Sequence, residues 1–164
     1  MPNWCFNALS LISEKKYLRE FNCNNTDSSG DIDFGRSVPF PSDRDEDEEW
    51  YHWRIENWGT KWTAFDTIMT PIFTGENDKE DEKESELIYE FCTAWSPPIE
   101  WLNTVSTMCP NIKFELKYQE PGVNYSGIFE IHAGDIIKDV NGKYGEYFGD
   151  IYFESDSDND NNTN

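Results

Sequence analysis

Two indole rings stand on either side of one cation in the stretch WGTKW, residues 58–62. Trp58 and Trp62 can stack on a base or another planar ring, and the Lys61 ammonium can meet a phosphate or carboxylate, so the spacing suits a planar anion. Aromatic clusters are more often core than site, however. In that interpretation Gly59 takes a positive φ in a turn, both indoles pack on a sheet, and Lys61 lies across one of them. The sequence favours this clamp and keeps the binding platform as the alternative.

Trp95 is a further candidate, in the stretch TAWSPP at the end of an alternating segment. Ser96 followed by Pro97 predicts the start of a helix. The amides of a first helical turn can bind an anion, but Pro97 and Pro98 remove two of those donors. We therefore expect a rigid strand-to-helix corner at this position.

Glu120 ends the alternating segment 112–120 in the inward-facing register. A carboxylate there needs a partner, because an unpaired buried charge is costly. We expect Lys61 to be that partner, and a role as a general base is the alternative. The candidate residues for binding a ligand or partner are thus Trp58, Lys61, Trp62, Trp95 and Glu120.

Other chemistry has little support in the residue pattern. The chain has 4 cysteines and 2 histidines, without a C-x-x-C pair or a metal-ligand spacing. It also lacks a glycine-rich phosphate loop and the signature of a catalytic triad. We expect no metal, no cofactor and no catalytic residue, and we expect free thiols in a reducing cytoplasm.

The composition favours one domain built on aromatic rings. Hydrophobic residues make up 37% of the 164 residues, and aromatic residues make up 16%. Because each ring buries a large area, a core is possible despite the low mean hydropathy. We predict a single domain over residues 1–153 and a disordered acidic tail over residues 154–164, whose composition is of low complexity.

Acidic residues are concentrated in three segments: residues 43–49, residues 76–86 and the tail. They hold 17 of the 33 acids but 3 of the 13 bases, within a net charge of −20. Such runs are usually solvated, so we expect the first two to be loop insertions. Direct binding to nucleic acid is not expected, since phosphate contact needs clustered Lys and Arg. No apolar run approaches a membrane span, and the N-terminus lacks the pattern of a signal peptide.

The order of periodic segments predicts the fold class. Strands and helices follow one another as strand, helix, strand, strand, helix, strand, and then a hairpin whose turn is Asn141-Gly142. This is an α+β, ferredoxin-like split βαβ arrangement: an antiparallel sheet with helices packed on one face, plus a C-terminal β-hairpin extension. The expected strands span residues 3–12, 32–34, 62–69, 87–95, 112–120 and 127–134. The expected helices follow a Ser13 cap, end at Gly59, and span residues 97–109.

Four motifs occur in a recognisable order: MPNWCFNAL, NWGTKW, FCTAWSPP and FELKYQEPGVNYSG. In these motifs the chain resembles the YubB ferredoxin-like domain family of plasmids, phages and some other viruses. The resemblance spans roughly residues 1–133, with the charged runs as insertions. It implies a ferredoxin-like fold without an iron–sulfur cluster and implies no established activity. The Asn- and Asp-rich loops and tail fit an AT-rich viral genome.

Two functions fit these expectations. The first is a small non-enzymatic protein of a virus or mobile element, acting in the host cytoplasm. It would bind a protein partner of basic character, such as a host or viral nucleic-acid-associated protein, through the free sheet face. The alternative is a nucleotide-like ligand-binding or catalytic domain that uses the aromatic and lysine residues as a pocket. Homo-oligomers through a sheet edge or face are also compatible.

Overall fold

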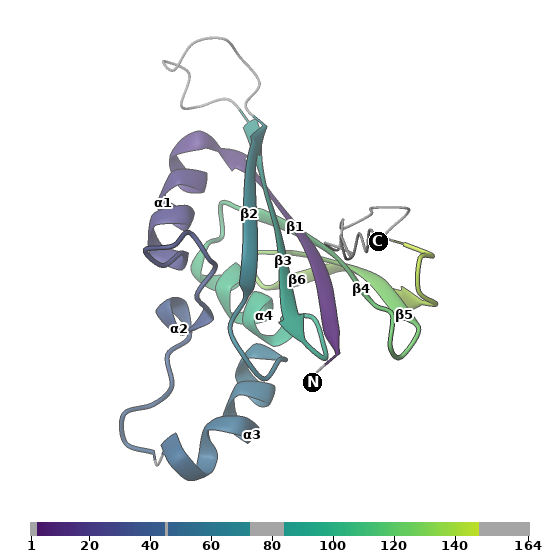
Figure 1. The fold of residues 1–164 in the computed structure, drawn as a ribbon. Helices are drawn as coiled ribbons and strands as arrows, with labels where there is room; N and C mark the ends of the chain where they lie inside the picture. The colour runs from purple at the N-terminus through teal and green to yellow at the C-terminus, as the bar shows by residue number, and fades with distance from the viewer. Residues whose placement is uncertain (1–2, 45, 73–83, 148–164) are drawn as a thin grey trace, which may run out of the picture.

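Ten regular elements follow one another in the described part of the chain (Figure 1). The structure is a computed structural model that describes residues 3–44, 46–72 and 84–147. The elements are β1 (Trp4–Glu14), α1 (Lys15–Asn25), α2 (Phe34–Ser37), α3 (Glu46–Trp58), β2 (Phe65–Ile72), β3 (Glu84–Ala94), α4 (Ile99–Met108), β4 (Lys113–Glu120), β5 (Tyr125–His132) and β6 (Asp135–Gly142).

The strands form one antiparallel sheet in the order β2-β3-β1-β4-β5-β6. The first four strands of that order are the split βαβ arrangement, and the β5–β6 hairpin extends the sheet beyond β4. Figure 1 shows α1, α2 and α4 on one side of the sheet, while α3 lies at its lower end. The predicted fold class is therefore confirmed.

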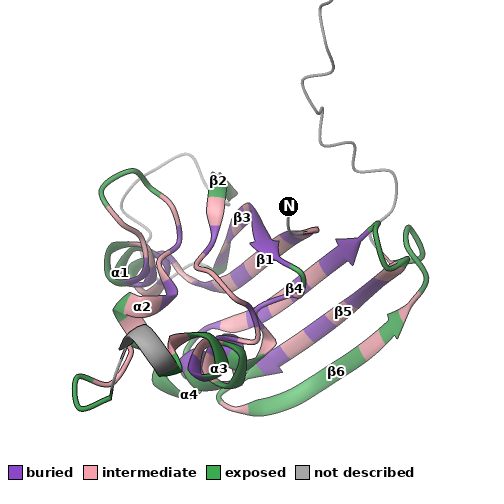
Figure 2. Ribbon diagram, turned by 60° about the horizontal axis from the view of Figure 1, so that its bottom comes forward, coloured by how far each residue is buried: buried purple, intermediate pink, exposed green. Residues whose placement is uncertain are grey.

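Side chains alternate between a buried and a more open face along the strands (Figure 2). On β1 the buried positions include Cys5, Leu9 and Leu11, each 0% exposed. Aromatic rings join this face to the helices: the ring centroids of Phe34 and Trp101 lie 4.7 Å apart. The helices thus cover one face of the sheet. The strand residues that alternate with the buried ones lie on the opposite, more open face.

The two outer strands, β2 and β6, are both irregular. The pairing of β2 with β3 shifts register between Phe65 and Ile68, where Asp66 has a φ of 53°. The pairing of β6 with β5 shifts register beside Glu130. Most of β6 is exposed (Figure 2).

The position of the C-terminal hairpin turn was predicted wrongly. The turn is Ala133-Gly134, whose φ angles are 50° and 85°, and Asn141-Gly142 lies inside β6 opposite β5. Two consecutive residues with positive φ are what a two-residue hairpin turn requires. β5 ends at His132, so the turn follows directly, although Ala133 is a poor residue for it.

The expected Ser13 cap is also wrong. Ser13 is buried at the end of β1, and its hydroxyl donates to the carbonyl oxygen of Asn111 at 2.6 Å. Glu14 is the residue before α1, without a side-chain hydrogen bond to the helix. The strand expected at residues 32–34 is a single bridge from Ile32 to Thr26, followed by α2. Ser13 does not cap the helix because β1 continues two residues beyond its expected end, to Glu14.

Both acidic runs are partly regular structure, which corrects the expectation of loops. Residues 46–49 begin α3, and residues 84–86 begin β3. Helix and strand continue into them because adjacent residues of the same elements are anchored in the core. Residues 76–83 of the second run and the tail from residue 154 lie outside the described residues. In the described ranges, no helix combines the length and apolar character needed to cross a bilayer.

Candidate functional site

Three stretches far apart in sequence meet at the lower end of the sheet. The Trp95 amide donates to the Asn3 carbonyl oxygen at 2.9 Å, which ties the end of β3 to the start of β1. The Thr60 hydroxyl donates to the Ala94 carbonyl oxygen at 2.9 Å, and the Ser96 hydroxyl donates to the Gly59 carbonyl oxygen. The WGTKW turn is thereby fixed to the TAWSPP corner.

Buried polar side chains of β1 and β3 fix the geometry of this corner through hydrogen bonds. Asn7, at 0% exposure, donates through Nδ2 to the Cys5 carbonyl oxygen at 3.0 Å and to Thr93 Oγ1 at 2.9 Å. The Thr93 hydroxyl in turn donates to the Ser96 carbonyl oxygen at 2.7 Å. Satisfied buried hydrogen bonds specify one geometry, because breaking one leaves a desolvated polar group.

Trp95 is held in a strained conformation with its side chain half exposed. Its φ is 73°, and the Ser96 amide donates to the Ala94 carbonyl oxygen at 3.0 Å, which closes a tight γ-turn around it. A bulky residue in the left-handed region costs about 1–3 kcal/mol and persists only where the surroundings enforce it. Trp95 is 49% exposed, so this strain is not repaid by full burial of the ring.

Three further rings lie beside the corner on the open face of the sheet. Trp4 points away from the helices, since its neighbour Cys5 faces them. Its ring centroid lies 4.6 Å from that of Phe65 in an edge-to-face arrangement and 6.2 Å from that of Trp62. Trp4, Trp62 and Phe65 are all partly exposed. We call Trp4, Lys61, Trp62, Phe65 and Trp95 the aromatic corner.

Lys61 lies against three aromatic rings. Its Nζ is 4.8 Å from the Trp62 centroid, 5.8 Å from Tyr51 and 5.9 Å from Trp50. The prediction that Lys61 lies across an indole is confirmed, and α3 supplies two rings that the sequence interpretation did not include.

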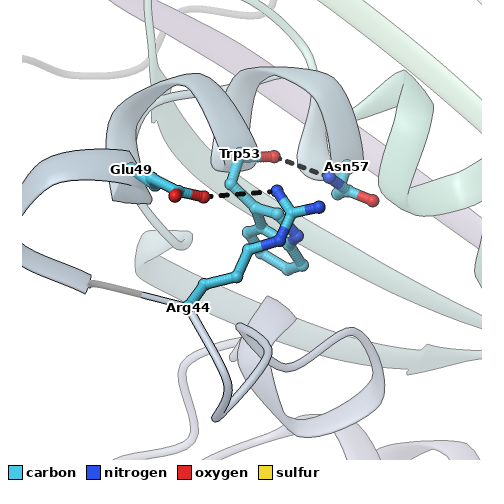
Figure 3. Close-up of polar contacts among 4 residues, drawn as sticks. All are labelled: Arg44, Glu49, Trp53 and Asn57. Atoms are coloured by element: carbon cyan, nitrogen blue, oxygen red, sulfur yellow. Dashed lines mark hydrogen bonds and ion pairs between the residues drawn. The ribbon is translucent and has the colours of Figure 1, made fainter.

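The start of α3 is joined to the loop before it by side-chain contacts. Figure 3 shows Arg44 reaching over Trp53 to the Glu49 carboxylate, with an Nη1 to Oε2 distance of 3.5 Å. In the same view Asn57 Nδ2 donates to the Trp53 carbonyl oxygen at 2.8 Å. The exposed ion pair contributes little stability, and burial of Trp53, at 7% exposure, anchors the helix.

Trp58 belongs to the core and not to the aromatic corner. It is 5% exposed, its Nε1 donates to the Val38 carbonyl oxygen at 2.9 Å, and its centroid lies 5.8 Å from that of Phe34. Gly59 has a φ of 81°, and its amide donates to the Ile55 carbonyl oxygen at 3.1 Å, so it ends α3 as predicted. In the WGTKW stretch, Trp58 is therefore packed in the core as a clamp, whereas Lys61 and Trp62 belong to the surface.

The predicted pairing of Glu120 with Lys61 is wrong. Glu120 is 1% exposed, and its carboxylate accepts hydrogen bonds from the Gly122 amide at 2.7 Å and the Val123 amide at 2.8 Å. Two amides of its own turn satisfy the buried carboxylate locally, so no distant cation is required. Glu120 is a turn residue at the end of β4.

The two buried thiols, Cys5 and Cys92, are poor nucleophiles. Burial raises the pKa of the Cys92 thiol to about 11, and it also raises the pKa of the Cys5 thiol. Both groups are therefore protonated near neutral pH. All four cysteines are free. No cluster of potential metal ligands is found in the described part of the chain.

Sequence interpretation identified Trp62, Lys61 and Trp95 but missed the residues that position them. Asn7 and Thr93 lie in strands for which the sequence interpretation considered only the alternation of apolar residues. The available signal was an asparagine in the buried register of β1, between Cys5 and Leu9. A polar residue at a core position needs partners and so indicates a buried network.

The fold and the site together define a ferredoxin-like α+β domain with an aromatic surface at one end of its sheet. Residues 73–162 match the family described as the ferredoxin-like domain in Api92-like protein. This match covers more than half of the chain, and the chain belongs to that family.

The protein api92 from Yersinia pseudotuberculosis has a crystal structure similar to this chain, with 20% sequence identity and a TM-score of 0.43. The similarity covers 58% of this chain and 30% of the other chain, so this chain spans less than a third of that protein. No curated protein matches the chain.

The assignment to the YubB family was wrong, because the chain matches the Api92-like family instead. The motifs that suggested the YubB family contain residues with structural roles in this fold. Gly59 ends a helix and Glu120 closes a turn. Short motifs of this kind report a fold more securely than they report one family within it.

Proposed function

We propose that this chain is a non-enzymatic binding domain that engages a protein partner through the aromatic corner. The observation that carries the proposal is Trp95, a half-exposed indole kept at a φ of 73° by a buried hydrogen-bond network. Strained residues cluster at functional sites, since elsewhere a less costly residue serves as well. Glycine would fit the same turn without strain.

The neighbouring rings suit a protein interface. Tryptophan is enriched among residues that dominate binding energy, and Trp4 and Trp62 are already in contact through their rings. Packing against Phe65 fixes the Trp4 ring before a partner arrives, which lowers the entropy lost on binding. A preorganised, partly exposed aromatic surface therefore supports recognition of another protein.

The charge of the chain favours a basic partner. A net charge of −20 attracts cationic proteins and speeds their encounter. The open face does not favour direct contact with nucleic acid. On that face Lys113 lies 3.2 Å from Glu130, and Lys117 lies 3.5 Å from Glu115, so each cation faces a carboxylate. Nucleic-acid-associated proteins are basic partners of the expected kind.

A pocket for a nucleotide-like ligand is less well supported. It required Trp58, Lys61, Trp62, Trp95 and Glu120 to line one concavity. Trp58 is committed to the core, and Glu120 is committed to its turn. The remaining rings form a surface that suits a larger partner.

A role for a virus or another mobile element in the cytoplasm of its host is part of the same proposal. The four free cysteines support the cytoplasm, because thiols persist in reducing compartments. The Asn- and Asp-rich composition of the tail supports the proposed origin in a virus or another mobile element.

Affinity capture with the full chain tests the proposal, read by mass spectrometry and followed by titration of the purified partner. The Trp95→Gly and Trp95→Asn variants remove the indole and retain a residue that accepts a positive φ. We expect both to weaken partner binding at least about 30-fold, as loss of about 2 kcal/mol at a dominant contact implies. Tyr144→Ala is the matched control, since Tyr144 is 47% exposed and lies beyond β6.

Equal binding by the wild-type chain and both Trp95 variants, with folds verified by circular dichroism, would refute the proposal. Equal loss in Tyr144→Ala would refute it as well, because binding would then not depend on the aromatic corner. Changes in tryptophan fluorescence with nucleotides, reaching saturation, would favour the ligand-binding alternative.

A further inference from the structure

The Lys61 ammonium occupies a three-walled aromatic enclosure. Trp50 and Tyr51 are consecutive in α3, and their rings are nearly perpendicular, with an interplanar angle of 88° and centroids 5.7 Å apart. Trp62 adds the third ring, 4.8 Å from Lys61 Nζ. We call Trp50, Tyr51 and Trp62 the cage.

The geometry arises directly from the helix. Successive residues of an α-helix project about 100° apart, so rings at neighbouring positions become two walls at a steep angle. The turn after Gly59 then brings Trp62 to the third side. Each ring presents a negative face, and three such faces around one point form a site for a cation. The Trp50 ring also lies 5.1 Å from the Arg54 guanidinium, so this wall is shared with a second cation.

The present occupant, the Lys61 ammonium, is held by cation–π contacts. Within the described residues the Lys61 ammonium has these rings as neighbours but neither a hydrogen bond nor a carboxylate partner. Lysine is a flexible side chain with four methylene groups, and its head is strongly hydrated. Moving it out into water breaks cation–π contacts alone.

We propose that the cage receives a lysine ammonium, primary or methylated, from a basic partner protein, and that Lys61 fills the cage in the free chain. The inference rests on the proposed function and names the partner's chemistry. The exposed Glu56 carboxylate lies on the same helix, whereas the Glu49 carboxylate is paired with Arg44, and the whole chain carries a net charge of −20. A cationic segment is therefore attracted to this chain.

An anionic ligand fits this place poorly. To meet an anion, Lys61 would have to leave the three rings, and the vacated ring faces would repel negative charge. A second cation entering the occupied cage is repelled by Lys61 itself. Removal of the Lys61 charge must therefore strengthen binding of a cation, whereas it would weaken binding of an anion.

The first test titrates the purified full chain with tetramethylammonium chloride and follows the indole N–H resonances of Trp50 and Trp62 by NMR. Sodium chloride at equal ionic strength controls for salt, and neopentyl alcohol is a neutral probe of similar shape. We expect Lys61→Ala to bind tetramethylammonium about 2- to 30-fold more tightly than the wild type, the range of about 0.5–2 kcal/mol for cation–π contacts.

Adding Tyr51→Ala to Lys61→Ala should abolish that gain, because it removes the most exposed wall, at 43% exposure. Tyr144→Ala in the same background should retain it. The inference is overturned if Lys61→Ala binds the cation no better than the wild type, if the neutral probe binds equally well, or if both tyrosine variants behave alike. Circular dichroism and the melting temperature verify that each variant is folded.

The second test uses peptides that contain a lysine, a trimethyllysine or a norleucine between arginines. The cage is supported if the lysine and trimethyllysine peptides bind more tightly than the norleucine peptide and if Lys61→Ala increases that difference. Equal binding of all three peptides overturns it. Neither test uses the captured partner. A failed cage with Trp95-dependent capture therefore removes this inference alone, whereas a working cage without such capture removes the proposed function.

Discussion

Replacing Gly59 with alanine tests the corner at its most constrained point. Gly59 has a φ of 81°, and an added Cβ would lie 3.1 Å from the Pro97 carbonyl oxygen and 3.3 Å from the Ile99 amide nitrogen. These neighbours are backbone atoms at the start of α4, so they cannot move aside as a flexible side chain can. The substitution therefore adds a contact to a conformation that alanine already disfavours.

Gly30→Ala separates the two effects. Gly30 has a φ of 90°, but an added Cβ meets no atom within 4 Å. It carries the conformational penalty alone, about 1–2 kcal/mol for a side chain in the left-handed region. Overpacking against fixed atoms adds about 1–3 kcal/mol. We therefore expect Gly59→Ala to lose about 2–5 kcal/mol of unfolding free energy, and Gly30→Ala to lose about 1–2 kcal/mol.

Urea denaturation, followed by tryptophan fluorescence, measures both losses. With a slope of about 2 kcal/mol per molar urea, Gly59→Ala should lower the midpoint by about 1–2.5 M at unchanged slope. A midpoint shift for Gly59→Ala no larger than that for Gly30→Ala would refute the reasoning. The turn would then be free to move away from α4, and the corner would not be rigid.

Two more predictions concern buried groups. Asn7→Ala should lower the unfolding free energy by about 2–4 kcal/mol, because Thr93 Oγ1 and the Cys5 carbonyl oxygen lose a buried donor; a thermal melt with no shift would contradict this. Because burial raises the pKa of Cys92 from 9.0 to about 11, its thiol ionises more readily in the unfolded chain. The resulting stability is present below pH 9 and is lost as the pH rises towards 11. A Cys92→Ala variant should show a weaker loss over that interval in urea titrations.

The alternating strands were predictable because their faces differ in burial. In the segment 112–120 the inward residues Phe114, Leu116 and Tyr118 are all buried, as their alternation indicates. Period-two patterns carry this information directly, since one face meets the helices and the other does not. The order of such segments was sufficient for the split βαβ arrangement.

Turn positions were less predictable, because register decides between competing turn sequences. Asn141-Gly142 is the stronger local signal, yet the chain turns at Ala133-Gly134. The buried positions of β5 fix where that strand ends, and the next two residues must turn whatever their propensity. A local rule cannot weigh that tertiary constraint.

The candidate site shows the same limit. Trp62 and Lys61 stand out in the sequence, but Tyr51 and Trp50 reach them from another element. For Glu120 the sequence suggested a distant cation, whereas amides two and three residues away satisfy it. Short-range hydrogen bonds of this kind depend on the path of the turn, which residue types alone do not define.

The irregular outer strands bear on how copies of this chain can associate. In β2 the bulge at Asp66 distorts the free edge, and Pro71 offers it no amide donor. In β6 a second bulge and the charged Lys138 and Asp139 make that edge unattractive as a template. Edge-to-edge pairing between copies is thereby discouraged at both edges of the described sheet.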